Sequence, residues 1–196
     1  MNNELIEYLH SVYPELPIDV SYMRGYSNEE IDKIERLYDI EVKDQLYDFL
    51  TSIGRCSGGL FGDDPLIFYQ NQKTIRGDIL FQIGSRQDLA SIQRHDLLKQ
   101  KPFFISVESY TQYFFVLTAS DNPDLIYQYD ENEETVEATD WDLKNYLRHV
   151  VNVYTRNYDV KASFDQHGEL IIIWLLKIPA LYWDLLICLI PLQPAG

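Results

Sequence analysis

The stretch PFFISVESYTQYFFVLTASDNPDLIYQYD, residues 102–130, decides the fold class of this 196-residue chain. It contains three short runs rich in aromatic and β-branched residues, PFFISVES, QYFFVLTA and DLIYQYD, and residues of these types favour β-strands. Polar residues separate the runs and mark the breaks between strands. Because consecutive strands usually lie side by side, the stretch predicts an antiparallel meander of three strands.

The residues before this stretch predict mainly helices, because apolar residues recur there at helical spacing. Ser27 and Glu30 form a capping box at the start of the second predicted helix. Pro14 ends the first helix and Gly54 ends the third. The predicted elements are helices at 3–13, 27–38 and 46–53, a short strand at 66–70 and a helix at 86–100.

The residues after the stretch predict an acidic loop, one further helix and a hairpin. Thr139 or Asp140 caps the helix, whose apolar stripe consists of Leu143, Leu147, Val150 and Tyr154. The hairpin consists of NYDVKASF, the turn DQHG and ELIIIWLL, residues 157–176. This order predicts the α+β class, with N-terminal helices packed on a mainly antiparallel sheet, a closing helix and a C-terminal hairpin. We expect a single domain over 1–196, with its core at 27–155 and an appendage at 158–196.

Residues 171–192, IIIWLLKIPALYWDLLICLIPL, are long enough to cross a bilayer. Lys177 and Asp184 are costly inside a membrane, and Pro179 breaks a helix. We therefore expect a buried strand and cap here, with membrane association kept as an alternative. The start of the chain lacks the pattern of a signal peptide, and Cys56 and Cys188 have no metal-like spacing. Both observations favour a cytoplasmic protein.

Negative charge is segregated along the chain, which has a formal net charge of −15. Between Pro102 and Leu143 there is no Lys, Arg or His, and there are ten acidic residues. Such a field repels nucleic acid and anionic membranes and attracts basic proteins. Tyr110, Tyr113 and other aromatic residues lie between the acids and favour a contact surface. A solvated face that only confers solubility is the alternative.

The motifs of enzymes and metalloproteins are missing from the sequence. The loop SGGLFGDD, residues 57–64, has no Lys-Ser or Lys-Thr after it and is therefore not a phosphate-binding loop. An EF-hand reading that starts at Asp130 fails, because Thr135 stands where Gly is needed and Trp141 where Glu is needed. No nucleophile motif such as GxSxG occurs. We expect no catalytic activity, no metal and no cofactor.

Two parts of the chain resemble the SUKH superfamily, which includes yeast cell-wall assembly regulators and bacterial toxin immunity proteins. In residues 29–54, EEIDKIERLYDIEVKDQLYDFLTSIG, the matching positions are Glu35, Leu37, Tyr47, Phe49, Leu50 and Gly54. Pro123, the pairs Ile126-Tyr127 and Tyr129-Asp130, and the helix of 140–154 match later positions. The chain departs from the family pattern at Val42-Lys43, where Leu-Pro is usual, and at Asp39, where Gly is frequent.

The resemblance implies a non-enzymatic protein that binds and neutralises a cognate bacterial toxin. Nuclease toxins are basic because they hold phosphate, so the implied partner is a basic nuclease domain and not nucleic acid or a membrane. A scaffold or regulator of the same superfamily is the alternative. The predicted partner-binding residues are Asp121, Asp124, Tyr127, Tyr129, Asp130, Glu131, Glu133, Glu134, Glu137, Asp140, Trp141 and Asp142.

Overall fold

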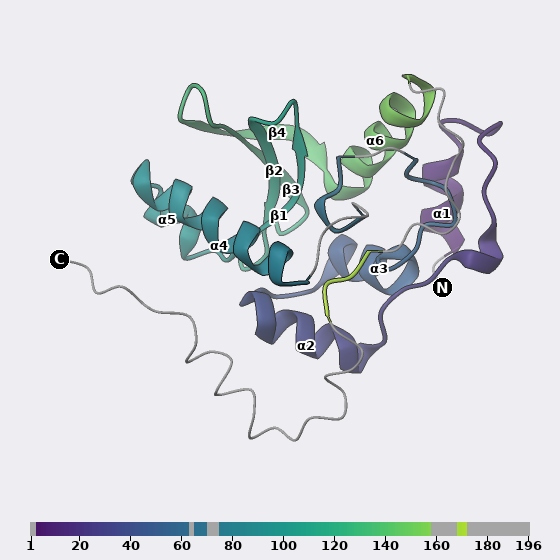
Figure 1. Ribbon diagram of the computed structural model, residues 1–196, viewed down its shortest axis with the longest axis horizontal. Helices are drawn as coiled ribbons and strands as arrows, with labels where there is room; N and C mark the ends of the chain where they lie inside the picture. The colour runs from purple at the N-terminus through teal and green to yellow at the C-terminus, as the bar shows by residue number, and fades with distance from the viewer. Residues whose placement is uncertain (1–2, 63–64, 70–74, 158–167, 172–196) are drawn as a thin grey trace.

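A four-stranded antiparallel sheet forms the centre of the protein. The computed structural model describes residues 3–62, 65–69, 75–157 and 168–171, and every structural statement below concerns these residues. The strands are β1 (Pro102–Glu108), β2 (Gln112–Leu117), β3 (Leu125–Asp130) and β4 (Thr135–Asp142), in the order β1-β2-β3-β4. With helices on both sides of this sheet (Figure 1), the fold belongs to the predicted α+β class.

Helices cover both faces of the sheet because both faces are apolar. Successive side chains of a strand point to opposite faces. Phe114 and Val116 of β2 therefore belong to the large core, while Phe115 and Leu117 of the same strand belong to a second apolar cluster. The covering helices lie on opposite sides of the sheet in Figure 1, with α4 and α5 on one side and α1, α3 and α6 on the other.

The large core is built by α1 (Asn3–His10), α2 (Asn28–Tyr38), α3 (Asp44–Ile53) and α6 (Leu143–Asn157). The predicted capping box is confirmed at α2, where Glu30 N donates to Ser27 Oγ and Ser27 N donates to Glu30 Oε2. The apolar stripes of α2 and α3 are buried, and α3 ends before Gly54 as predicted.

The opposite face of the sheet is covered by α4 (Ile75–Ser91) and α5 (His95–Leu98). Leu89 and Leu97 are buried there against Phe104 and Phe115. The inward face of α4 also carries polar side chains, because Asp78, Gln82 and Ser85 are buried. This helix is therefore held to the sheet by hydrogen bonds as well as by apolar contacts.

The outer edge of β1 is closed by side chains of α4 and by the segment before it. Gln82 Nε2 donates to Phe104 O at 2.7 Å, and Phe104 N donates to Gln82 Oε1 at 3.0 Å. The side-chain amide of Gln82 thus bonds both backbone groups of Phe104, as a neighbouring strand would. Arg86 Nη2 donates to Pro102 O at 2.9 Å, and Val107 N donates to Pro65 O at 3.1 Å.

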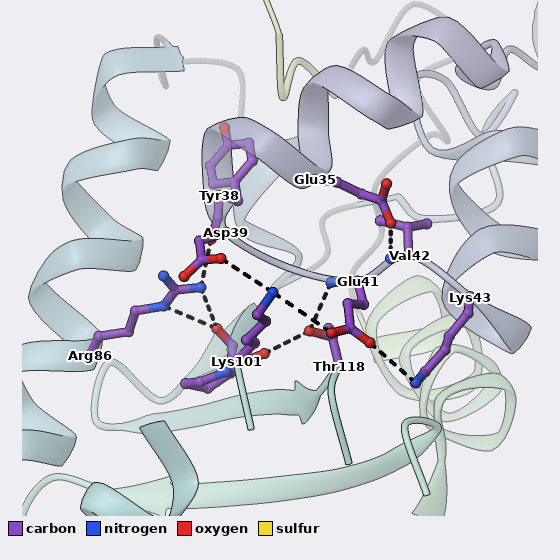
Figure 2. Close-up of polar contacts among 10 residues, drawn as sticks. Glu35, Tyr38, Asp39, Glu41, Val42, Lys43, Arg86, Lys101 and Thr118 are labelled. Carbon is purple, nitrogen blue, oxygen red and sulfur yellow. Dashed lines mark hydrogen bonds and ion pairs between the residues drawn. The ribbon is translucent and has the colours of Figure 1, made fainter. Parts of the chain in front are cut away.

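A polar junction fixes the connection between α2 and α3 to the ends of β1 and β2 (Figure 2). Lys101 Nζ lies 3.4 Å from Asp39 Oδ1 and 3.7 Å from Glu41 Oε1. Thr118 Oγ1 accepts from Glu41 N and donates to Lys101 O. Arg86 reaches the same junction and donates to Tyr38 O at 2.7 Å. Burial lowers the pKa of this arginine, and its donors are taken by backbone carbonyls.

Residues 168–171 lie in the large core, where they bond two tyrosines that are more than 130 residues earlier in the chain. Tyr26 Oη donates to Gly168 O at 3.0 Å and accepts from Leu170 N at 2.9 Å. Tyr38 Oη donates to Leu170 O at 2.9 Å. Leu170 is fully buried, so the two tyrosine hydroxyls satisfy backbone groups that have lost contact with water.

Several predicted elements differ from the observed ones. The stretch predicted as an acidic loop contains β4, and Asp142 rather than Thr139 or Asp140 caps α6, since its Oδ1 accepts from Asn145 N at 2.8 Å. Of the strand predicted at 66–70, Leu66 forms an isolated β-bridge with Ser106, Ile67–Tyr69 form a 3₁₀ turn, and Gln70 lies outside the described residues. A second 3₁₀ turn spans Val20–Tyr22. The helix predicted at 86–100 is divided between α4 and α5, and the first helix ends at His10.

Two predictions concern the C-terminal part of the chain. The hairpin over 157–176 and the apolar stretch 171–192 lie almost wholly outside the described residues. In the part that the structure does describe, every helix is too short or too polar to cross a bilayer.

The Gln82 contact predicts a large effect on stability. Replacing Gln82 by Ala leaves the buried N–H and C=O of Phe104 without partners, so we expect the free energy of unfolding to fall by about 2–4 kcal/mol. Denaturant unfolding measures this change. Gln87→Ala is the matched control, because Gln87 is exposed on the same helix. An equal effect of both substitutions would contradict this role of Gln82.

Candidate functional site

Two turns meet at one end of the sheet. The β1–β2 turn, Ser109–Thr111, and the β3–β4 turn, residues 131–134, lie side by side, because Glu131 N donates to Thr111 O at 2.9 Å. We call the residues 109–111 and 130–134 the turn surface. It holds four of the predicted site residues, Asp130, Glu131, Glu133 and Glu134.

The β1–β2 turn presents a tyrosine to solvent in an unfavourable backbone conformation. Ser109 and Tyr110 have φ values of 51° and 66°, and Thr111 N donates to Glu108 O at 3.3 Å. Positive φ at both central residues is the geometry of a type I′ turn, which favours Gly and Asn. The Tyr110 side chain is 92% exposed, so it gains little from packing in return for this conformation.

The β3–β4 turn is shaped by its first carboxylate. Asp130 Oδ1 accepts from Asn132 N at 2.9 Å and from Glu133 N at 3.3 Å. An aspartate that bonds the backbone two residues later is a common turn-forming motif. Because this motif folds the turn tightly, Glu131, Glu133 and Glu134 are all exposed together at its tip.

The negative charges of the turn surface contribute to raised pKa values of three nearby side chains. Tyr113 Oη donates to Glu131 Oε2 at 3.0 Å, and burial together with this bond raises the pKa of Tyr113 to about 12. Partial burial and the nearby charge of Glu131 raise the pKa of Asp88, on α4. Burial and the charges of Asp88, Glu131, Glu134 and Asp130 also raise the pKa of Tyr129. Negative charges therefore act on one another across the turn and α4.

No basic side chain neutralises these acids within the described residues. The ion pairs found there include neither the half-buried Asp130 nor any of the exposed acids Asp121, Glu131, Glu133, Glu134, Glu137 and Asp140. Arg94, the cation that contacts β4, is already paired with Asp96 at 3.2 Å. Among the described residues, the exposed charge of β4 and its turn is thus not balanced by a basic side chain.

Two predicted site acids lie at the other end of the sheet and support helices. Asp124 Oδ1 accepts from Gln45 N at 3.0 Å, at the start of α3. Asp142 Oδ2 accepts from Gln45 Nε2 at 3.2 Å, and its Oδ1 caps α6. Burial, followed by the charges of Asp44 and Asp142, raises the pKa of Asp124 despite the bond from Gln45. Asp121 lies in the same connection and is exposed.

The three predicted aromatic site residues are buried to different extents. Tyr129 is only 4% exposed, and its ring centroid lies 5.7 Å from that of Tyr113. Tyr127 is half-buried and stacks on Phe115. Trp141 is half-buried on the opposite face of the sheet and stacks on His149. The twelve predicted residues therefore do not form one surface.

The structure adds Asp88 to the candidate site, and it places Tyr110, one of the aromatic residues between the acids, in the exposed β1–β2 turn. Tyr110 lies between two strand-like runs, so its place in an exposed turn could be read from the sequence. The position of Asp88 could not, because it depends on how α4 packs on the sheet. No group of three or more potential metal ligands occurs among the described residues.

Two hollows lie elsewhere on the described part of the protein. A hollow of about 400 Å³ is lined by Asp44, Gln45, Tyr47, Asp48, Asp124 and Lys144. Lys144 Nζ lies 3.6 Å from Asp48 Oδ2 there, so its charge is already balanced. A second hollow of about 300 Å³ lies between α1 and α6.

Comparison with known proteins adds no assignment. No protein family, curated protein or solved structure matches this chain.

The positive φ of Tyr110 predicts that glycine at this position stabilises the protein. Tyr110→Gly removes a left-handed, exposed tyrosine, so we expect the free energy of unfolding to rise by about 0.5–1 kcal/mol. Thermal or denaturant unfolding measures the change. Thr111→Gly is the control, because Thr111 does not have positive φ and glycine there is expected to destabilise. A loss of stability in Tyr110→Gly would contradict the strained conformation.

The raised pKa of Asp88 predicts a pH-dependent effect. A carboxyl whose pKa is higher in the folded state stabilises the fold below its unfolded pKa, and this contribution is lost as pH rises. We therefore expect Asp88→Asn to raise the melting temperature at pH 7, by about 1–2 °C for an exposed group. The gain should vanish near pH 3, where Asp88 is protonated in both states. Asp32→Asn, an exposed aspartate of α2, serves as the control and should show no such gain.

Proposed function

We propose that this protein is a cytoplasmic immunity protein that binds and neutralises a basic toxin, most suitably a nuclease domain. One observation carries the proposal: exposed acids that form no ion pair among the described residues lie in the turn beside the one that bears the exposed Tyr110. Segregated charge raises the association rate of an oppositely charged partner. An exposed aromatic ring gives such a partner an anchor that excludes water.

The electrostatics of the site support a cationic partner. Burial and the charge of Glu131 raise the pKa of Asp88, and cations brought by a partner would relieve the repulsion between these two carboxylates. A nuclease must present Lys or Arg to hold phosphate. An acidic protein seated on those side chains competes with nucleic acid for the same surface, which would inhibit the enzyme without any catalysis by the inhibitor.

The resemblance to the SUKH superfamily supports the same proposal through two details. Glu35, at a matching position, accepts from Val42 N at 2.7 Å and so holds the turn between α2 and α3. Asp39, where the family often has Gly, has a φ of 48°, in the region that Gly favours. A glutamate that holds this turn, and a residue with the backbone conformation of glycine before it, are both compatible with the family pattern, although Asp39 differs from it in residue type.

The proposal predicts that charge at the β3–β4 turn controls partner binding. Reversing Glu131, Glu133 and Glu134 to Lys should weaken the complex by about 100-fold or more, because desolvated charge pairs at interfaces contribute about 1.5 kcal/mol or more each. Basic nuclease domains of bacterial toxins, including any that is encoded beside this gene, are the test partners, with affinity and cell survival as readouts. The same reversal at Glu7, Glu15 and Glu29, which are exposed on α1, on the connection after it and on α2, is the matched control.

Unfolding curves of the two triple variants establish that the fold is kept. Equal affinity of both variants would contradict the turn surface as the binding site. Several weak partners in a pull-down, with no rescue of survival, would favour a scaffold or regulatory protein instead.

A further inference from the structure

The two outer edges of the sheet differ in how their backbone groups are satisfied. On β1, Arg86 bonds Pro102, Gln82 bonds Phe104, and Pro65 accepts from Val107. On β4, no further strand follows in the sheet that the structure describes. An open strand edge is a ready template for another chain, so the question is which backbone groups β4 exposes.

The hydrogen-bond pattern of β2 and β3 identifies these groups. Residues opposite one another in an antiparallel pair alternate between bonded and non-bonded pairs. Since Glu131 N bonds Thr111 O, the next bonded pair across β2 and β3 contains Tyr129. The backbone groups of Gln128 and Asp130 are therefore directed away from β2, towards β4.

The same alternation continues across β3 and β4. Gln128 lies opposite Glu137, and Asp130 lies opposite Thr135. Because Glu137 and Thr135 bond β3, the backbone groups of Val136 and Ala138 point out of the sheet. Arg94 agrees with this direction, since its Nη1 lies 3.5 Å from Val136 O. Ala138 is exposed, and by the same alternation its N–H and C=O point away from β3.

Charge decides which kind of chain fits this edge. Glu137 and Asp140 are exposed on β4, the turn acids Glu133 and Glu134 precede it, and none of the four forms an ion pair among the described residues. A second copy of β4 would bring the same acids to the edge, and like charges on neighbouring strands destabilise pairing. A strand that carries Lys or Arg would form favourable pairs instead.

We propose that the outer edge of β4 receives an extended, Lys- or Arg-bearing segment of the partner protein as a fifth strand of the sheet. The segment's main chain bonds Val136 and Ala138, and its cationic side chains lie beside Glu137 and Asp140. Strand addition of this kind takes affinity from the main chain and specificity from the side chains. The inference rests on the proposed function, because it specifies how the basic toxin is held.

A synthetic ten-residue peptide of alternating Lys and Thr tests the edge on the full-length protein. Amide hydrogen exchange, followed by NMR, should show that saturating peptide slows exchange at Ala138 by about tenfold or more, as expected for one added hydrogen bond. The same peptide with every backbone nitrogen methylated keeps the charge but has no main-chain donors or ladder geometry. It should give no protection.

Three results would overturn strand addition. Equal protection by both peptides would show attraction by charge alone, and protection by neither would show that the edge does not accept a strand. If exchange at Ala138 is slow without peptide, and becomes slower as the protein concentration rises, the edge pairs with a second copy of this chain.

A proline variant separates this inference from the proposed function. Ala138→Pro removes an N–H that points out of the sheet, so the β3–β4 ladder is kept, and toxin affinity should fall about tenfold. Ala138→Thr keeps the N–H and is the matched control. If the proline variant binds like the threonine variant while reversal of Glu131, Glu133 and Glu134 abolishes binding, strand addition fails and the proposed function stands. If neither the proline substitution nor the charge reversal weakens binding, strand addition and the proposed function both fail.

Discussion

The paired hydrogen bonds between Gln82 and Phe104 are the contact on which the arrangement of this protein depends. They hold α4 against the sheet and at the same time close the outer edge of β1. With α4 in place, the second apolar face of the sheet is covered, and β4 is the edge that no other described strand pairs with. A polar side chain on a buried helix face thus determines both the layering of the fold and the asymmetry of its sheet.

Acidic residues have a different role at each end of the sheet. At the end of the sheet near α3 and α6, Asp124 and Asp142 bond backbone amides at the starts of helices, where anionic groups are stabilising. At the opposite end, the acids of the turn surface exceed what turn formation needs. Asp130 alone bonds that turn, while its exposed neighbours raise the pKa values of nearby groups. The surplus charge is the basis of the proposed function.

Sequence patterns predicted the parts of this fold that depend on local chemistry. The Ser27 capping box, the apolar stripes of α2 and α3 and three of the four strands follow from nearby residues alone. The fourth strand was missed because Thr135–Asp142 is an exposed edge strand with acids along it, and its pairing with β3 is a tertiary contact. Of the candidate site, the acids were predicted, but their division between two ends of the sheet depends on strand direction. Asp88 joins them only through the packing of α4.

The position of residues 168–171 has a consequence for synthesis of the chain. Tyr26 and Tyr38 lie near the N-terminus, yet their buried hydroxyls bond backbone groups more than 130 residues later. During translation these tyrosines leave the ribosome long before Gly168 and Leu170 exist. The part of the large core around Tyr26 and Tyr38 can therefore be completed only after residue 170 has been made, and contacts between such distant residues slow folding. A nascent chain that stops earlier keeps both hydroxyls and their apolar neighbours open to chaperones.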